Sequence, residues 1–365
     1  MLKDAVPLGE CRRALVIKLR HHGDVLLAAP VISVLKARGI EVDALVYDDT
    51  APMLQGHPGL SELHVVGRAW RSQRFSRLSK EFSLYGELKG RNYDLIVHLS
   101  EQPRGAWLAR VLGARFSVAP AMKDRGAFWR RSFTHLYPIA ARRHQVEVNL
   151  DALRRLGIQP APEQKKVTFV PGADAERKIE SLLDGRPFVQ VHPASRWRFK
   201  CWPAEKNAEL IERLSAEGLK VVVTAAPDDA EKRFVEEILG KTTANPLNLA
   251  GKLSIKELGA LAARAKIFVG VDSMPMHLAA AMGTPTVALF GPSGEAEWGP
   301  HFIPGGAAHR VVTSNHSCRP CGLDGCGGGK VSECLTTLPV EAVHAAAREL
   351  LAQGPRTQIL KSTAG

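Results

Sequence analysis

The stretch that decides the fold is IKLRHHGDVL at residues 17–26, where an apolar strand leads into a polar, glycine-containing turn and then a helix. A second stretch of this kind, VGVDSMPMHLAAA, occupies residues 269–281. Each places an aspartate, Asp24 or Asp272, at the carboxyl end of a strand, the edge at which open α/β sheets bind ligands. The sequence therefore predicts two half-sites that face one cleft.

Outward from these stretches, strand-like and helix-like segments alternate along the whole chain. The predicted strands are 13–17, 42–47, 63–66, 95–99, 114–118, 188–192, 219–224, 267–271 and 286–290. The predicted helices are 24–38, 76–88, 104–112, 146–156, 204–217, 230–239, 254–263, 276–282 and 339–351. Pro30 lies inside the first helical pattern and predicts a break or kink there. Such alternation predicts parallel sheets with right-handed crossovers, an α/β fold.

A proline-containing segment at 160–166 has linker composition, and the strand and helix pattern restarts beyond it. A chain of 365 residues is long enough for two domains, each with its own core. We therefore predict a Rossmann-like domain at 1–165 and a second one at 166–338. The amphipathic helix within 339–353 is expected to return to the first domain.

The chain is basic, with a formal net charge of +12, and its positive residues concentrate at 68–91 and 125–143. Such a field attracts phosphate groups on nucleic acid, anionic lipid or a phosphorylated sugar. Nucleic acid is disfavoured, because aromatic residues make up 6% of the chain and no recognition motif is present. A solvated basic face without a ligand stays open as an alternative.

Membrane insertion and secretion are also disfavoured by the sequence. No uncharged apolar run reaches the 18 residues that a spanning helix needs. The first residues include Lys3, Asp4 and Glu10, which do not resemble a secretory signal. The expected location is therefore the cytoplasm, with possible peripheral contact at the inner membrane.

Five motifs together resemble glycosyltransferase family 9, the ADP-heptose:lipopolysaccharide heptosyltransferases, and most closely their heptosyltransferase III type. They are KLRHHGDVL at 18–26, HPASRWRFKCWP at 192–203, DSMPMH at 272–277, LFGPS at 289–293 and CRPCG at 318–322. The resemblance implies a GT-B fold of two Rossmann-like domains facing a central cleft. It also implies ADP-heptose as donor, the lipopolysaccharide inner core on lipid A as acceptor, inversion at the anomeric carbon, and no metal or other cofactor. The first domain would bind the acceptor and the second the ADP-sugar.

Two residues are the candidate catalytic groups. Inverting transfer needs a general base for the attacking hydroxyl and a positive group for the leaving diphosphate. Asp24 fits the base, since Gly23 allows a tight turn before it, although an aspartate here also fits a helix N-cap. Lys200 fits the diphosphate, and the alternative for it is a surface lysine. The family resemblance favours the catalytic interpretation of both.

The remaining donor contacts are expected in the second domain. Asp272 is expected to bind heptose hydroxyls, and the helix start at Ser273 and Met274 to present N–H groups to phosphate. Asp228, with Asp229 as its neighbour, follows a strand and is expected to bind the ribose, unless it caps the next helix. The other expected donor residues are Ser195, Arg196, Lys252, Leu253 and His277, of which His277 is open to a structural interpretation.

The acceptor contacts have no motif of comparable strength. The basic residues expected to meet core phosphates or acidic sugars are Lys18, Arg20, Arg104 and Arg143. A cysteine cluster, with members at Cys318, Cys321, Cys326 and Cys334, permits a structural zinc site, but its spacing is not that of a standard zinc ribbon. We assign it no catalytic role, and no metal site is predicted.

Three other functions compete with this interpretation. A dinucleotide-dependent enzyme would need a G-x-G-x-x-G turn after the first strand, and none is present. A non-catalytic nucleotide-sugar or lipopolysaccharide binder would be expected to lack Asp24 or Lys200. The third candidate is a family 9 transferase of another acceptor or sugar specificity, such as the heptosyltransferase I or II type. The sequence distinguishes it poorly from the type III enzyme, because acceptor loops vary most.

Overall fold

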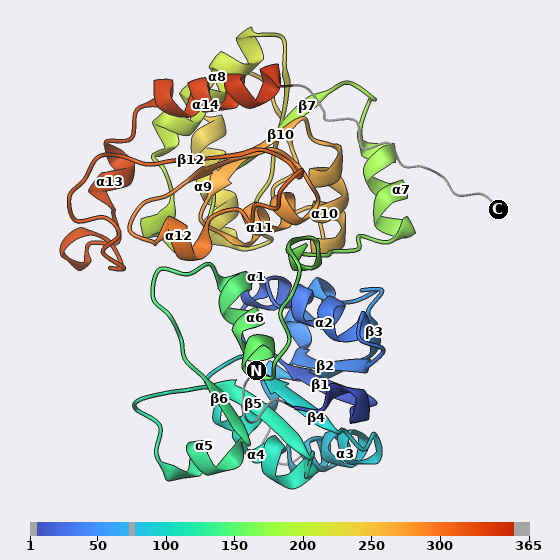
Figure 1. The fold of residues 1–365 in the computed structure, drawn as a ribbon. Coiled ribbons are helices and arrows are strands. Elements are labelled where there is room, and N and C mark those ends of the chain that lie inside the picture. The colour runs from blue at the N-terminus through green and yellow to red at the C-terminus, as the bar shows by residue number, and fades with distance from the viewer. Residues whose placement is uncertain (1–5, 73–76, 354–365) are drawn as a thin grey trace. The chain divides into compact units, whose positions relative to one another are not determined.

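The computed structural model describes residues 6–72 and 77–353, and contacts divide the chain into two compact units, Met1–Gly172 and Ala173–Gly365. Each unit contains one six-stranded parallel sheet flanked by helices (Figure 1). The division falls after Gly172, whereas the sequence placed it after residue 165. The proline-containing segment itself forms a single 3-10 turn, Pro162–Lys165.

The first unit contains six strands in the order β3-β2-β1-β4-β5-β6. The strands are β1 (Arg13–Ile17), β2 (Glu41–Tyr47), β3 (Leu60–Val66), β4 (Leu95–His98), β5 (Phe116–Pro120) and β6 (His135–Tyr137). The helices are α1 (His22–Leu26), α2 (Ala29–Lys36), α3 (Arg77–Gly90), α4 (Pro103–Leu112), α5 (Ala127–Ser132) and α6 (Gln145–Arg155).

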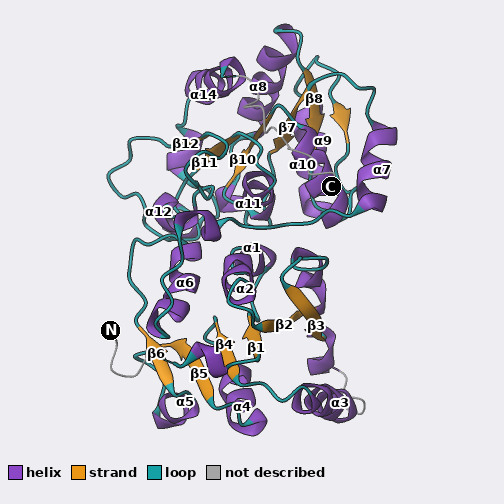
Figure 2. Cartoon of the chain, turned by 45° about the vertical axis from the view of Figure 1, so that its right-hand side comes forward, coloured by secondary structure: helices purple, strands orange, loops and turns teal. Residues whose placement is uncertain are grey.

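Helices cover both faces of this sheet (Figure 2). On one face Leu15 and Ile17 of β1 share a buried cluster with Leu88 of α3, Leu108 of α4 and Trp129 of α5. Helices α2 and α6 pack on the other face and on each other. Because both faces are covered, β1 and β4 are continuous apolar runs without polar alternation, as is typical of parallel sheets.

The predicted helix at 24–38 is two helices in the structure. Helix α1 ends at Leu26 and α2 begins at Ala29, with Pro30 in its first turn. Proline is tolerated there because the N–H that it lacks has no partner inside the helix. The predicted break near Pro30 is therefore confirmed.

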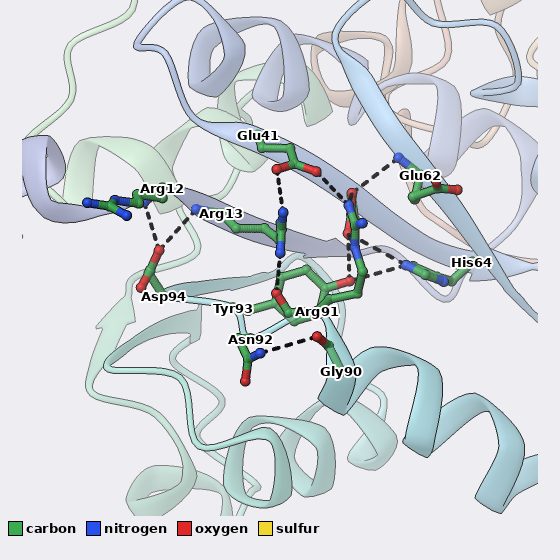
Figure 3. Close-up of polar contacts among 11 residues, drawn as sticks. Arg12, Arg13, Glu41, Glu62, His64, Gly90, Arg91, Asn92, Tyr93 and Asp94 are labelled. Carbon is green, nitrogen blue, oxygen red and sulfur yellow. Dashed lines mark hydrogen bonds and ion pairs between the residues drawn. The ribbon is translucent and has the colours of Figure 1, made fainter.

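A buried network of polar side chains lies at the amino end of this sheet (Figure 3). Asp43 of β2 is fully buried and accepts hydrogen bonds from Arg91 Nε at 2.7 Å and from the Tyr93 hydroxyl at 2.8 Å. His64 lies 3.1 Å from the same hydroxyl, and its Nδ1 is 2.6 Å from Glu87. The network joins β2, β3 and the segment before β4, which supports the sheet at the edge away from its ligand-binding end.

The charges in this network are mutually stabilised. Burial by itself raises the pKa of Asp43, but the hydrogen bonds from His64, Arg91 and Tyr93 outweigh it and hold that pKa well below its usual range. Burial lowers the pKa of His64, yet its contacts with Asp43 and Glu87 produce a net increase. Asp43 is therefore a buried carboxylate that stays ionised because its partners stay in place.

The second unit repeats the strand order of the first, as β9-β8-β7-β10-β11-β12. Its strands are β7 (Phe188–His192), β8 (Lys220–Val223), β9 (Leu247–Asn248), β10 (Ile267–Val271), β11 (Thr286–Leu289) and β12 (His309–Val312). Its helices are α7 (Ala173–Leu182), α8 (Ala204–Ala216), α9 (Asp229–Leu239), α10 (Ile255–Arg264), α11 (Met274–Ala281), α12 (Glu295–Trp298), α13 (Glu333–Thr336) and α14 (Val340–Ala352).

Helix α14 packs within the second unit, which differs from the expected return to the first domain. It contacts α8, β10, β11 and β12 (Figure 1). Its residues Val343, Ala347 and Leu350 are buried in the same apolar cluster as β7 and α8. The apolar stripe that predicted this helix is therefore buried on the sheet of the second unit, and a contact of α14 with the first domain stays a prediction.

The sequence patterns did not predict several short elements. Helix α5, strand β6 and strand β12 were all missed, and each of the two strands lies at a sheet edge. Strands of three or four residues carry too few positions to show a period of two, so their pairing depends on neighbours that are distant in sequence.

Candidate active site

Each sheet has a topological switch point, where successive connections leave in opposite directions. In the first unit it lies between β1 and β4, and in the second between β7 and β10. The loops at the carboxyl ends of these two strands diverge, and the crevice between them is where open α/β sheets bind ligands. The predicted half-sites around Asp24 and Asp272 follow β1 and β10, and therefore lie at these switch points.

In the first half-site Asp24 lies in α1, just beyond the end of β1. The helix begins at His22 with His21 at its N-cap, so Asp24 is not the capping residue that the alternative interpretation required. Its side chain is 11% exposed, and its Oδ1 lies 3.7 Å from Arg20 Nε. Arg20 also forms an ion pair with Glu101, which follows β4. Arg20 thus links the segment after β1, which contains Asp24, to the loop after β4, which contains Glu101.

Lys18 has a different position from the one expected for an acceptor contact. It is buried, and its ammonium donates to the Leu99 carbonyl at 2.8 Å and to Asn149 Oδ1 at 3.0 Å. Burial lowers the pKa of this ammonium, partly offset by the charge of Asp24. Lys18 therefore ties the end of β1 to the end of β4 and to α6. Its role in this structure is to position the Asp24 loop.

The other predicted acceptor residues are engaged with carboxylates. Arg104 in α4 forms a two-point ion pair with Glu81 of α3. Arg143 lies 3.1 Å from Asp151, on α6. Of the four predicted acceptor residues, Lys18 and Arg20 contact the Asp24 loop and its surroundings, and an acceptor role for Arg104 and Arg143 stays a prediction.

In the second half-site Lys200 and Asp272 form a direct ion pair. Lys200 Nζ lies 2.6 Å from Asp272 Oδ2, and the two side chains are 22% and 7% exposed. Lys200 follows β7 and Asp272 follows β10, so this pair joins the two switch-point strands. Ser195 is half-buried in the loop after β7, where its Oγ accepts from the Trp197 N–H at 3.3 Å, while Arg196 is exposed.

Helix α11 begins immediately after Asp272. Ser273 occupies the N-cap without a side-chain capping bond, Met274 is half-buried, and Pro275 occupies the first turn. The helix start therefore leaves backbone N–H groups at the carboxyl edge of β10, as the phosphate-binding interpretation requires. His277 is buried one turn on, with its ring centroid 6.4 Å from that of Trp298.

Asp228 occupies the N-cap of α9, which is the structural alternative stated for it. Its Oδ1 accepts from the N–H groups of Ala230 at 2.9 Å and Glu231 at 3.2 Å. Asp229 is exposed and pairs with Lys232. Lys252 is exposed, with its ammonium 2.8 Å from the Asn248 carbonyl, and Leu253 packs against the cluster under α10. None of these contacts tests a role in nucleotide binding.

Replacing Asp228 by alanine is expected to lower the free energy of unfolding by about 1 kcal/mol, because two N–H groups of α9 lose their cap. Serine at this position should restore most of that loss, since its hydroxyl also caps. Chemical denaturation of the three proteins measures the difference. If the serine variant is as stable as the wild type but binds ADP more weakly, the carboxylate belongs to the nucleotide site as well.

The cysteine cluster contains no disulfide. Cys318, Cys321 and Cys326 are exposed and Cys334 is buried, where burial raises its pKa and the neighbouring cysteine thiols raise it further. The Glu333 N–H donates to Cys326 Sγ at 3.4 Å. Within residues 6–72 and 77–353 no three side chains of the ligating types are arranged to hold a metal ion. Metal-independent catalysis stays a prediction.

Some residues of the first half-site were missed by the sequence analysis. Glu101 lies far from Arg20 in sequence, and only the pairing of β1 with β4 brings them together. Arg68 donates to Asp49 at 2.7 Å and to the Arg20 carbonyl at 3.0 Å, which fixes the loop before Asp24. The carboxyl-end position of Glu101, two residues after a predicted strand, was a signal that could have found it.

Each unit contains a Rossmann-like sheet of the same strand order with polar loops at its switch point, which is the architecture of the domains of a GT-B fold. A family model for "Glycosyltransferase family 9 (heptosyltransferase)" matches residues 82–331. Lipopolysaccharide heptosyltransferase 3 of Escherichia coli is 37% identical over 288 residues, which cover 77% of this chain and 84% of that protein. The chain belongs to glycosyltransferase family 9.

Solved structures share the fold of the chain. The family 9 glycosyl transferase from Veillonella parvula matches with a TM-score of 0.81 at 22% identity, covering 96% of this chain and all of that chain. The E. coli heptosyltransferase WaaC, solved with ADP-2-deoxy-2-fluoro heptose, matches with a TM-score of 0.68 at 21% identity, covering 92% and 99%. The predicted family and GT-B fold are confirmed.

None of the helices in residues 6–72 and 77–353 is both long enough and apolar enough to cross a bilayer.

Proposed function

We propose that this protein transfers heptose from ADP-heptose to the lipopolysaccharide inner core, with the acceptor specificity of the heptosyltransferase III type. The relative with that name, together with the family model, supports the substrate class. The observation that carries the proposal is the position of Asp24 and of the Lys200 and Asp272 pair, each at the switch point of its own sheet. Because lipid A anchors the acceptor, the proposed place of reaction is the cytoplasmic face of the inner membrane.

Asp24 serves as the general base in the proposed reaction. An acceptor hydroxyl oxygen attacks the anomeric carbon of the heptose, and its proton passes to the Asp24 carboxylate. The bond from that carbon to the β-phosphate oxygen breaks with inversion, and ADP leaves with the electron pair. Arg20, held between Asp24 and Glu101, orients the base. Lys18 fixes the loop that carries Asp24 by its hydrogen bonds to the Leu99 carbonyl and to Asn149.

The second half-site stabilises the leaving diphosphate. Charge develops on the β-phosphate as the glycosidic bond breaks, and Lys200 supplies a cation together with the N–H groups at the start of α11. In the structure Lys200 neutralises Asp272. With donor, the ammonium turns to the diphosphate and the Asp272 carboxylate accepts from heptose hydroxyls. The ion pair thus holds both side chains in position for the donor, while the ammonium and the carboxylate each have a partner of opposite charge.

Replacing Lys200 by methionine is expected to lower kcat/KM by about 10²-fold, the effect of removing one group that stabilises developing charge. Steady-state ADP release measures it. The matched control is Lys220→Met, since Lys220 also pairs with an aspartate, Asp184, but at the amino end of β8. Equal losses in both variants would contradict a specific role for Lys200.

The experiment that tests the proposed function measures ADP release from ADP-heptose with core acceptors that carry no heptose, one heptose, or more than one. Turnover that requires an acceptor with more than one heptose supports the type III assignment, and best turnover on the acceptor with one heptose would assign the type II specificity. Best turnover on the heptose-free acceptor would assign the type I specificity. No turnover on any acceptor would overturn heptosyl transfer, in favour of another donor sugar or a non-catalytic binder.

A further inference from the structure

The outward faces of α3 and α4 in the first unit carry large apolar side chains. Leu78 and Phe82 of α3 are 65% and 70% exposed, and Trp107 and Val111 of α4 are 59% and 39% exposed. Each pair is spaced four residues apart, so each helix presents an apolar stripe to the outside, in addition to the stripe that packs on the sheet. An ordinary surface helix carries polar residues at these positions.

These side chains line a groove between the two helices, which we call the α3–α4 groove. Its volume is about 580 Å³, and Leu78, Phe82, Tyr85, Trp107, Leu108 and Val111 form its apolar wall. The ion pair of Arg104 with Glu81 also lines it. The apolar surface continues onto α5, where Phe128 is 41% exposed and its ring centroid lies 5.0 Å from that of Trp107.

The three helices that form this face carry more positive than negative charge. Helices α3, α4 and α5 contain seven basic residues, Arg77, Lys80, Lys89, Arg104, Arg110, Arg130 and Arg131, and two acidic ones, Glu81 and Glu87. Both acidic residues already have a basic partner, Arg104 or His64. The Arg110 guanidinium lies over the Phe128 ring, 5.1 Å from its centroid, so its charge stays beside the apolar surface.

We propose that the α3–α4 groove and the adjoining face of α5 dock the enzyme on an anionic phospholipid bilayer. Tryptophan and phenylalanine are favoured at the level of the lipid headgroups, and arginine and lysine beside them are attracted to anionic lipid. This inference rests on the proposed function in one respect, because a lipid-anchored acceptor gives the enzyme a reason to approach the membrane.

A second copy of the chain fits this face less well. A symmetric dimer would place the same basic surface on both sides of the interface, and like charges brought together oppose association. A bilayer with anionic lipid satisfies both features of the face, because it takes up apolar side chains and neutralises cations. The chemistry of the face therefore favours the membrane.

The test is co-sedimentation of the full chain with vesicles of phosphatidylcholine, alone or in equal parts with phosphatidylglycerol. The wild type is expected to bind the mixed vesicles and to lose binding as salt is raised. The double variant Phe82→Ser with Trp107→Ser should bind roughly tenfold more weakly or worse, because two aromatic side chains leave the interface. The double variant Arg130→Gln with Arg131→Gln should weaken the preference for the anionic lipid.

The matched control is Phe302→Ser with Leu323→Ser, which removes side chains of 60% and 59% exposure from the second unit. This control should bind mixed vesicles like the wild type. Equal binding by the Phe82 and Trp107 variant, or no binding by the wild type, would overturn the proposal. A dimer in sedimentation velocity that the same variant abolishes would instead assign the face to self-association.

Transfer to a soluble core oligosaccharide without lipid A separates this inference from the proposed function. The Phe82 and Trp107 variant is expected to keep wild-type turnover there, because neither side chain belongs to the site at the switch point. Absence of turnover in both proteins would count against heptosyl transfer and leave the vesicle result standing. Loss of turnover in the variant alone would show that the substitution disturbs the first unit itself. That result would overturn the proposal that these two residues act only at the membrane.

Discussion

Replacing Asp24 by asparagine is expected to lower kcat by about 10²–10⁴-fold, the contribution of a positioned general base. Asparagine keeps the size of the side chain and its place in α1, but its amide cannot take the proton of the attacking hydroxyl. Since the residues proposed to bind ADP lie in the other unit, the affinity for ADP should stay near that of the wild type. Steady-state ADP release and calorimetric titration with ADP measure the two effects.

The control for this substitution is Asp174→Asn. Asp174 lies in α7 of the second unit, where its side chain is 96% exposed and pairs with Arg177. Its substitution should leave turnover near that of the wild type. Undiminished turnover in the Asp24 variant would remove this residue from the role of base, and a parallel loss of ADP affinity would indicate misfolding instead.

The second large effect is expected at Asp43. Replacing it by alanine should lower the free energy of unfolding by about 3 kcal/mol, because the substitution removes the carboxylate from the buried Tyr93 hydroxyl and leaves Arg91 with Glu41 alone. This value is at the low end for a broken buried pair, since the Arg91 side chain is 26% exposed and partly solvated. Urea denaturation of the full chain measures it.

A surface aspartate with two cationic partners provides the control. Asp184 pairs with Arg186 and Lys220 in solvent, and Asp184→Ala should change the stability little. Similar losses in the Asp43 and Asp184 variants would contradict the view that burial makes the Asp43 network important.

The sign of the pH dependence follows from the direction of the Asp43 shift. Its pKa is lower in the folded than in the unfolded chain, so the unfolded state binds more protons and the network stabilises the fold at neutral pH. That contribution is present above the ordinary aspartate pKa of about 3.9 and declines as the pH falls below it. The Asp43→Ala protein should therefore lose less stability than the wild type on acidification.

The sequence predicted the class of the fold and the location of the site because both depend on local patterns. The strand and glycine turn before Asp24 and the strand before Asp272 are each contained in about ten residues, and the structure places both at switch points. Parallel α/β sheets bind ligands at that edge, so the sequence pattern was sufficient. Most strands of the central sheets were predicted nearly to their observed ends.

Features that depend on distant contacts could not be predicted in the same way. Lys18 lies next to the Asp24 loop in sequence, yet its ammonium is buried because Leu99 and Asn149 supply acceptors from elsewhere in the chain. The sequence cannot separate such a lysine from one that faces substrate. For the same reason Glu101 was missed, and the packing of α14 on the sheet of the second unit was not predicted.

The position of α14 affects how the chain folds during synthesis. Domains generally fold as units, the N-terminal one first. The first unit is contiguous, so it has its whole sheet available once the ribosome has released residue 172. The second unit cannot complete its core until α14 has emerged, because Val343 and Leu350 fill space beside β7 and α8. A premature stop before residue 340 would therefore leave a folded first unit attached to an incomplete partner, which is a substrate for proteolysis.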